Sequence, residues 1–173
     1  MEVGLEVIRY ILPALIMLVV TYIMLSMFMG NEEKKRMYDI KKEGRRNAMP
    51  IRLQAYERLA LFLERIQPAN MMVRIKAHQM NVAGYQAILL QTIRNEYEYN
   101  LSQQIYVSND TWKMIKAAKD STVSLINQAA KNLNPDQNAE DLRELVLQIL
   151  AAKERTPSDR ALDFLKNEVM AEL

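Results

Sequence analysis

The sequence predicts an all-α protein with an N-terminal transmembrane helix followed by a cytoplasmic helical bundle of about five helices. Its 173 residues include only four glycines and five prolines, fewer turn-forming residues than an all-β fold requires. No segment alternates apolar and polar residues for long enough to suggest a strand. An uncharged apolar run lies near the N-terminus, and amphipathic helical patterns fill the chain after residue 50.

The run from Tyr10 to Met29 contains no charged residue. At a rise of about 1.5 Å per residue, about 20 helical residues cross the roughly 30 Å hydrocarbon core of a bilayer. A cleavable signal peptide would have basic residues before the run and small residues after it. Here Glu2, Glu6 and Arg9 precede the run and make that stretch slightly acidic, and the run ends in Met27-Phe28-Met29 before Gly30. We therefore expect residues 1–30 to be a transmembrane anchor in contact with the lipid bilayer.

Basic residues are concentrated directly after the anchor. Of residues 30–76, 12 are Lys or Arg and 6 are Asp or Glu. Because basic residues close to a span stay on the cytoplasmic side, we expect an inner-membrane protein with its N-terminus outside. The basic juxtamembrane segment, residues 31–49, either contacts anionic lipid headgroups or only fixes topology and solvates a linker; its interspersed acids favour the second interpretation. The candidate headgroup contacts are Lys34, Lys35, Arg36, Lys41, Lys42, Arg45 and Arg46.

Residues 50–173 are expected to form one cytoplasmic all-helical domain. Pro50 suits the first turn of an amphipathic helix that ends near Gln67. A long helix follows over about 69–106, with an irregular start at 70–79 where it could break. Its apolar stripe predicts a buried face that includes Tyr85, Leu101 and Ile105.

The remaining helices are marked by their capping residues. Ser108 ends the long helix and caps the next one, which runs to Leu133. A shorter helix over about 142–149 follows the loop 134–138. The sequence Thr156-Pro157-Ser158-Asp159 supplies an N-cap, a first-turn proline and an acid at the third position, which opens the last helix.

The stretch from Arg94 to Tyr106 is rich in Tyr, Glu, Asn and Gln beside an apolar face. It is either a polar pocket or partner-binding face, since Tyr is enriched at interface hot spots, or a satisfied network that fixes helix register. The second interpretation is favoured by the sequence. The candidate partner-binding residues are Arg52, Arg58, Arg65, Glu96, Tyr97, Tyr99, Tyr106 and Trp112.

No catalytic motif, metal site or cofactor site is predicted. His78 is the only histidine and cysteine is absent, so the usual metal-ligand spacings do not occur. The glycines form no phosphate-binding loop, and no G-x-S-x-G sequence supports a serine nucleophile. The basic stretch lacks the clustered aromatics typical of nucleic-acid binding, so no nucleic-acid partner is expected.

Two segments, residues 51–66 and Glu96 to Tyr106 with Trp112 after it, resemble a family of single-pass membrane-anchored helical proteins from Gram-negative bacteria whose function is unassigned. The resemblance implies a cytoplasmic helical domain behind one span, and no named activity.

Two hypotheses of function remain open. The first is a non-enzymatic membrane-tethered scaffold or accessory subunit of an inner-membrane complex, which binds a membrane-protein partner or a second copy of itself. The second is a membrane-bound enzyme or ligand-binding domain whose Glu, Tyr, Asn and Gln side chains line a pocket. Pairing of those side chains with one another would count against the second.

Overall fold

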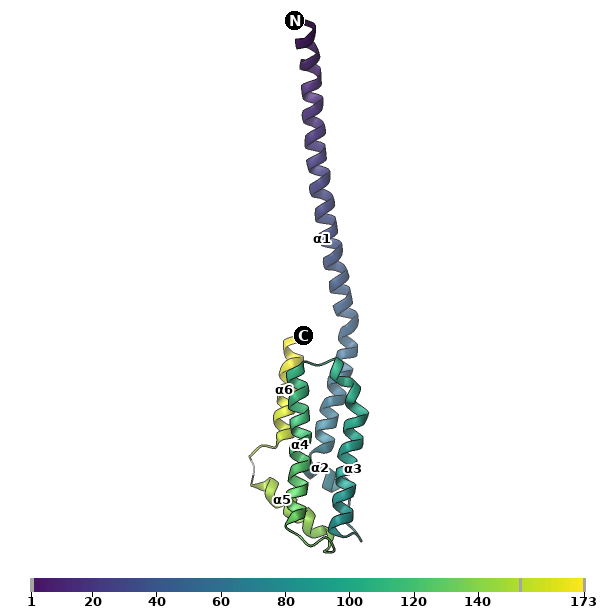
Figure 1. The fold of residues 1–173 in the computed structure, drawn as a ribbon, viewed down its shortest axis with the longest axis vertical. Coiled ribbons are helices and arrows are strands. Elements are labelled where there is room, and N and C mark those ends of the chain that lie inside the picture. Colours follow the sequence, from purple (N-terminus) through teal and green to yellow (C-terminus); the bar gives the residue numbers. More distant parts are fainter. Residues whose placement is uncertain (1, 153, 173) are drawn as a thin grey trace. The chain divides into compact units, whose positions relative to one another are not determined.

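The computed structural model describes residues 2–152 and 154–172, without the side chains of residues 2–10, 12–14, 30–34, 45 and 172. The all-α prediction is confirmed, because the described residues contain six α-helices, one 3-10 helix and no β-strand (Figure 1). An isolated bridge joins Asn81 to Asn138. The chain divides into two compact units, of which the first ends at Met49 and the second begins at Pro50.

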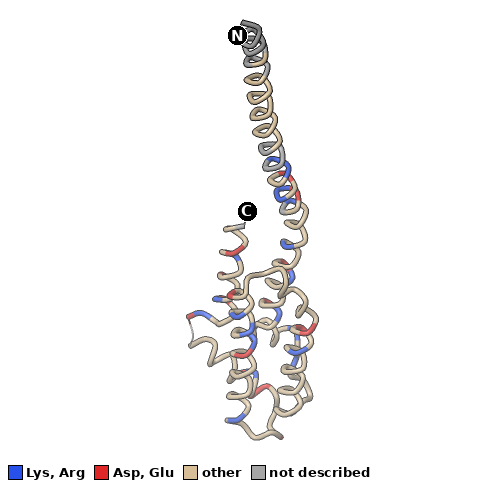
Figure 2. Tube along the Cα trace, turned by 45° about the horizontal axis from the view of Figure 1, so that its top comes forward, with Lys and Arg blue, Asp and Glu red and all other residues tan. Residues whose placement is uncertain are grey.

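The first unit is the N-terminal part of helix α1 (Glu2–Ile66). Every side chain from 15 to 29 is exposed, and all are uncharged. Thr21 satisfies its hydroxyl on its own helix, donating to the carbonyl oxygen of Met17 at 2.7 Å. Figure 2 shows the backbone of this uncharged stretch in tan, with the positions of Lys and Arg in blue after it.

The membrane span predicted at Tyr10–Met29 lies only partly among the described side chains, since residues 10 and 12–14 fall outside them. Within the part of the chain that is described, no helix combines the length and apolar content needed to cross a membrane.

The helix start predicted at Pro50 is wrong, because α1 is continuous from Glu2 to Ile66. Proline removes one backbone N–H, which leaves the carbonyl four residues earlier, at Arg46, without its helical partner. Both Pro50 and Arg46 are exposed, so water can solvate that carbonyl. The end predicted near Gln67 is confirmed.

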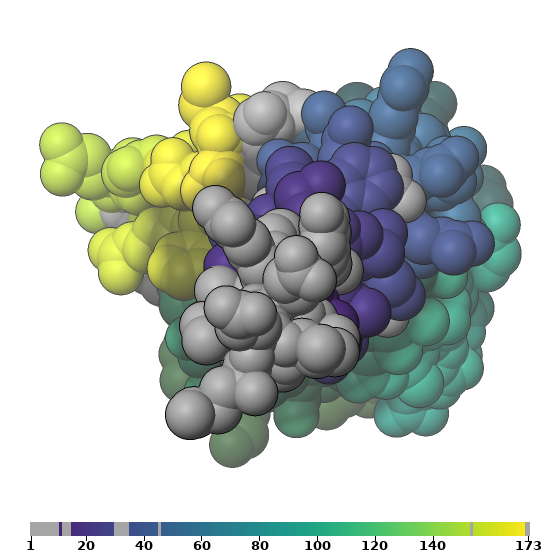
Figure 3. Space-filling model, turned by 90° about the horizontal axis from the view of Figure 1, so that it is seen from above, coloured from purple at the N-terminus to yellow at the C-terminus, as the bar shows by residue number. Residues whose placement is uncertain are grey.

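The second unit is a bundle built on the last turns of α1 together with helices α3, α4 and α6. Helix α4 packs against α3 and α6. Residues 56 and 62 of α1 contact α6 and α3, so these four elements form a closed ring. Figure 3, seen from above, shows α6 in yellow and α3 in teal on different sides of the bundle. The helices after α1 are α2 (Pro68–Arg74), α3 (Val82–Asn100), α4 (Asn109–Lys131), α5 (Ala139–Ala151) and α6 (Pro157–Glu172), with the 3-10 helix η1 (Leu101–Ile105) between α3 and α4.

The core follows the predicted apolar stripes on α1, α3, α4, α5 and α6. Its largest fully buried side chains include Leu59, Tyr85, Ile115 and Leu142. The stripe predicted along 69–106 fails at its end, where Leu101 and Ile105 are exposed. The segment there winds as a 3-10 helix, so the α-helical spacing of three and four no longer points these side chains inward. The break allowed within 70–79 is confirmed, since α2 ends at Arg74 and α3 begins at Val82.

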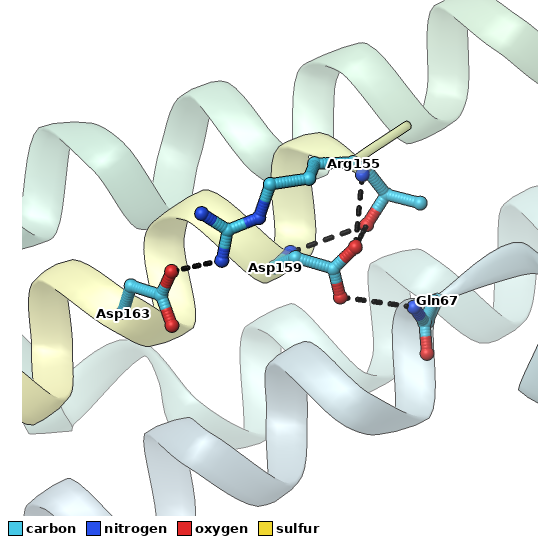
Figure 4. Close-up of polar contacts among 5 residues, drawn as sticks. Gln67, Arg155, Asp159 and Asp163 are labelled. Atoms are coloured by element: carbon cyan, nitrogen blue, oxygen red, sulfur yellow. Dashed lines mark hydrogen bonds and ion pairs between the residues drawn. The ribbon is translucent and has the colours of Figure 1, made fainter. Parts of the chain in front are cut away.

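Capping residues determine where the later helices begin. The Ser108 hydroxyl accepts from the Thr111 N–H at 3.2 Å and caps α4, as predicted. At α6 the capping box is also confirmed: the Asp159 carboxylate accepts from the Thr156 N–H at 2.8 Å, and the Thr156 hydroxyl accepts from the Asp159 N–H at 3.2 Å. Figure 4 shows Asp159 also accepting from Gln67, just beyond α1, and Arg155 paired with Asp163.

Candidate functional site

A cluster of polar side chains in the second unit is centred on the carboxylate of Glu168, on α6. One oxygen accepts from the Tyr56 hydroxyl at 2.9 Å and from the Ser108 N–H at 2.8 Å. The other accepts from the Ser108 hydroxyl at 2.6 Å and from the Thr111 hydroxyl. Because Ser108 and Thr111 open α4, the negative charge lies at a helix N-terminus, where it is stabilised by the helix dipole. One carboxylate therefore joins α1, α4 and α6.

The pKa values of Glu168 and Tyr56 reflect this cluster. Burial by itself would raise the pKa of Glu168, but hydrogen bonds from Ser108 and Thr111 outweigh it and lower the pKa. Burial, reinforced by the hydrogen bond to Glu168, raises the pKa of Tyr56 to about 12. At neutral pH the pair is therefore a phenol donating to a carboxylate, an arrangement that stabilises the bundle.

Arg52 extends this cluster toward η1. Its guanidinium donates to the Tyr56 hydroxyl at 2.9 Å and to the Tyr106 carbonyl oxygen at 3.2 Å. Of the predicted partner-binding residues, Arg52 and Tyr106 are thus brought together through the Tyr106 main chain. Glu168 was not among the sequence candidates, because one acid in a charged helix has no local signature.

Other candidate residues pair with each other across α1 and α3. The guanidinium of Arg65 forms an ion pair with Glu96 at 2.8 Å. The guanidinium of Arg58 lies 4.9 Å from the ring centroid of Tyr99, a cation–π contact. Tyr99 is 73 % exposed, so this pair forms on the surface of the bundle.

Tyr97 and Trp112, also candidates, lie against the core. Their rings stack with centroids 5.8 Å apart, and Tyr97 also contacts Phe62 at 6.1 Å. The ammonium of Lys119 lies 4.7 Å from the Tyr97 ring centroid. These contacts join α1, α3 and α4, so both rings serve packing between helices.

Several polar side chains between residues 94 and 106 have partners within the fold. The Asn100 amide donates to the carbonyl oxygen of Glu96 at 2.8 Å, and the Gln103 amide donates to the Ser102 hydroxyl at 3.2 Å. These two bonds lie within the segment, and the ion pair between Arg65 and Glu96 joins it to α1. The paired side chains count against a polar ligand pocket.

An apolar groove of about 350 Å³ runs between α1 and α6 on the outside of the bundle. Its exposed lining atoms are all apolar, although Glu57 and Lys166 lie at its rims. Tyr56 forms part of its floor, so the groove lies over the Glu168 cluster. The lining residues are Leu53, Tyr56, Glu57, Ala60, Leu165, Lys166, Val169 and Met170.

The juxtamembrane basic residues belong to the first unit. Lys35, Arg36, Lys41, Lys42 and Arg46 are exposed on α1, whereas the side chains of Lys34 and Arg45 lie outside the described residues.

Carboxylates and histidine do not gather anywhere among the described residues in a group of three or more that could hold a metal ion. His78 is exposed in the connection between α2 and α3.

The family model of DUF7935, a family of unknown function, matches residues 2–172. The chain belongs to the DUF7935 family. No curated protein and no solved structure is detectably similar to it. Family membership thus extends over both units and brings with it no assigned activity.

Proposed function

We propose that this chain is a non-enzymatic scaffold or accessory subunit of an inner-membrane complex. The N-terminal part of α1 anchors it in the bilayer, and the helical domain from Pro50 onward binds a protein partner in the cytoplasm. The observation that carries the proposal is the exposure of every side chain from 15 to 29, none of them charged. An apolar surface on all sides of a helix is costly in water, and lipid removes that cost.

The charges after this stretch support the cytoplasmic orientation. Lys35, Arg36, Lys41 and Lys42 are exposed, and basic residues near a span are retained inside the cell. Headgroup contact by these side chains is part of the proposal, since each would contribute on the order of 1 kcal/mol near an anionic surface.

Apolar surface that remains uncovered on the domain supports a binding role. The candidate polar residues Arg65, Glu96 and Tyr97 have partners within the fold. The groove between α1 and α6 is apolar and open, which is the chemistry of a protein contact.

Membrane extraction tests the proposal. Alkaline carbonate should leave the chain in the membrane pellet, and non-ionic detergent should release it. Val20→Arg places a charge at the middle of the apolar stretch, at a cost of about 2.5–3.5 kcal/mol for a central charge, and should shift the chain toward the soluble fraction. Met37→Arg, beyond the stretch, is the matched control and should change nothing. Recovery of the unmodified chain without detergent would refute the anchor.

A further inference from the structure

We propose that the groove between α1 and α6 binds a second copy of this chain, and that a two-fold axis parallel to the helices relates the two copies. The inference rests on the proposed partner-binding role of the domain and names the partner. It follows from the pattern of side chains along the two edges of the groove. We call these edges the rims, one formed by α1 and the other by α6.

The two rims carry the same pattern with opposite charge. On α1, the residues Leu53, Glu57 and Leu61 follow one another at four-residue spacing and so share a helix face. On α6, Leu162, Lys166 and Met170 do the same. Each rim therefore has one charge between two apolar side chains, with the negative charge on α1 and the positive charge on α6.

The two rims are level with each other. The hydrogen bonds from Tyr56 to Glu168 and from Gln67 to Asp159 show that α1 and α6 run in opposite directions and set their register. In this register Leu53 is level with Met170, Glu57 with Lys166, and Leu61 with Leu162, each within about 3 Å along the helix axis.

Four of these six side chains are exposed within one chain, whereas Leu53 and Leu162 are half-buried. Leu61 and Leu162 continue the two rims beyond the residues that line the groove. Leu61 is 56 % exposed and Met170 is 78 % exposed. Glu57 and Lys166 have no hydrogen bond or ion pair within the part of the chain that the structure describes. The groove thus presents apolar surface and two opposite charges that a partner could satisfy.

A two-fold interface pairs each surface with its own copy, so the direction of the axis decides which rims meet. A two-fold axis parallel to the helices leaves each residue's position along the helix direction unchanged. It places α1 of one copy against α6 of the other. Glu57 then faces Lys166 of the second copy, and Leu53 faces Met170. An axis across the helices would instead bring Glu57 toward Glu57 of the second copy, and like charges oppose association.

Charge exchange in the full chain tests the inference. Light scattering in non-ionic detergent should give twice the chain mass of 20.1 kDa. Glu57→Lys should weaken dimerisation more than tenfold, and adding Lys166→Glu should restore it. The same exchange at Glu98→Lys, an exposed acid on α3, is the control and should leave the dimer intact. Circular dichroism and Trp112 fluorescence should show that all variants remain folded.

Cysteine cross-linking tests the axis, because the chain has no cysteine of its own. Two differently tagged chains, one with Leu53→Cys and one with Met170→Cys, should form a mixed disulfide. Chains carrying Leu53→Cys alone should not.

A mass of one chain, or a dimer indifferent to Glu57→Lys, would overturn the inference, and so would a groove occupied only by a different protein. A monomer that still resists carbonate extraction would overturn the dimer while leaving the anchor standing.

Discussion

The Tyr56 hydroxyl on α1 donates a hydrogen bond of 2.9 Å to the Glu168 carboxylate, 112 residues later on α6. The same carboxylate accepts from Ser108 and Thr111 at the start of α4. This contact fixes α1 beside α6, and it is therefore the structural basis of the groove between them.

Removing the carboxylate should destabilise the bundle. Glu168→Ala leaves the Tyr56 hydroxyl, the Ser108 N–H and the hydroxyls of Ser108 and Thr111 without their acceptor. We expect a loss of about 2–4 kcal/mol in the free energy of unfolding. Glu168→Gln keeps one acceptor oxygen and should cost less. Urea unfolding followed by circular dichroism measures both, with Glu98→Ala as an exposed control expected within about 0.5 kcal/mol of the parent. Equal stability of Glu168→Ala and this control would contradict the assignment.

Acid should weaken the fold through the same group. Burial opposes the charged form of Glu168, but the hydrogen bonds from Ser108 and Thr111 prevail, so its pKa in the folded chain lies below the ordinary 4.5. The stability it contributes is complete above that ordinary value and is lost as the pH falls through the lowered folded pKa. The urea midpoint should therefore fall more steeply with acidification in the parent than in Glu168→Gln. Parallel pH profiles would rule out this role.

Alkali should act on Tyr56. Burial, with the hydrogen bond to Glu168, raises its pKa from 10.0 to about 12, so the folded chain holds this proton where the unfolded chain releases it. This difference stabilises the fold fully at pH values below the pKa of the unfolded chain. The stabilisation disappears as the pH rises toward the pKa of the folded chain, and each pKa unit between the two corresponds to about 1.4 kcal/mol. Tyr56→Phe should lack this part of the alkaline decline, as measured by unfolding between these two pKa values. An unchanged slope in Tyr56→Phe would count against the buried phenol.

The stacked pair of Tyr97 and Trp112 should matter more than the neighbouring exposed tyrosine. Tyr97→Ala removes contacts with Trp112 and Phe62 and should cost about 3 kcal/mol. It should also change the fluorescence of Trp112, the only tryptophan. Tyr99→Ala removes a surface cation–π contact and should cost under about 1 kcal/mol. If the two substitutions cost the same, Tyr97 would not be an inter-helix packing residue.

The cap of α6 should be worth a measurable amount of stability. Thr156→Ala removes the hydroxyl that accepts from the Asp159 N–H, at an expected cost of about 1 kcal/mol. Asp159→Ala should cost more, because it also breaks the contact with Gln67. Thermal unfolding compares the two variants, and the reverse order would show that the contact with Gln67 contributes nothing.

Local signals predicted the helices and several of their ends. Ser108 and the Thr156–Asp159 box were identified from side-chain chemistry within a few residues, and the structure confirms both caps. The apolar stripes of α4 and α5 follow the predicted spacing because each helix is regular over its length.

Features that depend on distant residues could not be predicted. Ile105 was expected in the core, but the chain tightens into a 3-10 helix after Asn100 and exposes it. Pro50 was expected to start a helix, yet the helix-forming residues on both sides carry α1 through it. Glu168 acquires its role only when α4 and α1 are placed beside α6.

We expect the uncharged stretch 15–29 to lie in lipid, with the helical domain on the cytoplasmic side of the membrane. Single cysteines introduced at Val20 and Lys41 in the otherwise cysteine-free chain test it directly with a water-soluble maleimide. In sealed inside-out membrane vesicles we expect the cysteine at residue 41 to react and that at residue 20 to stay unmodified until detergent and denaturant expose it. Equal labelling at both positions in intact vesicles would contradict the account.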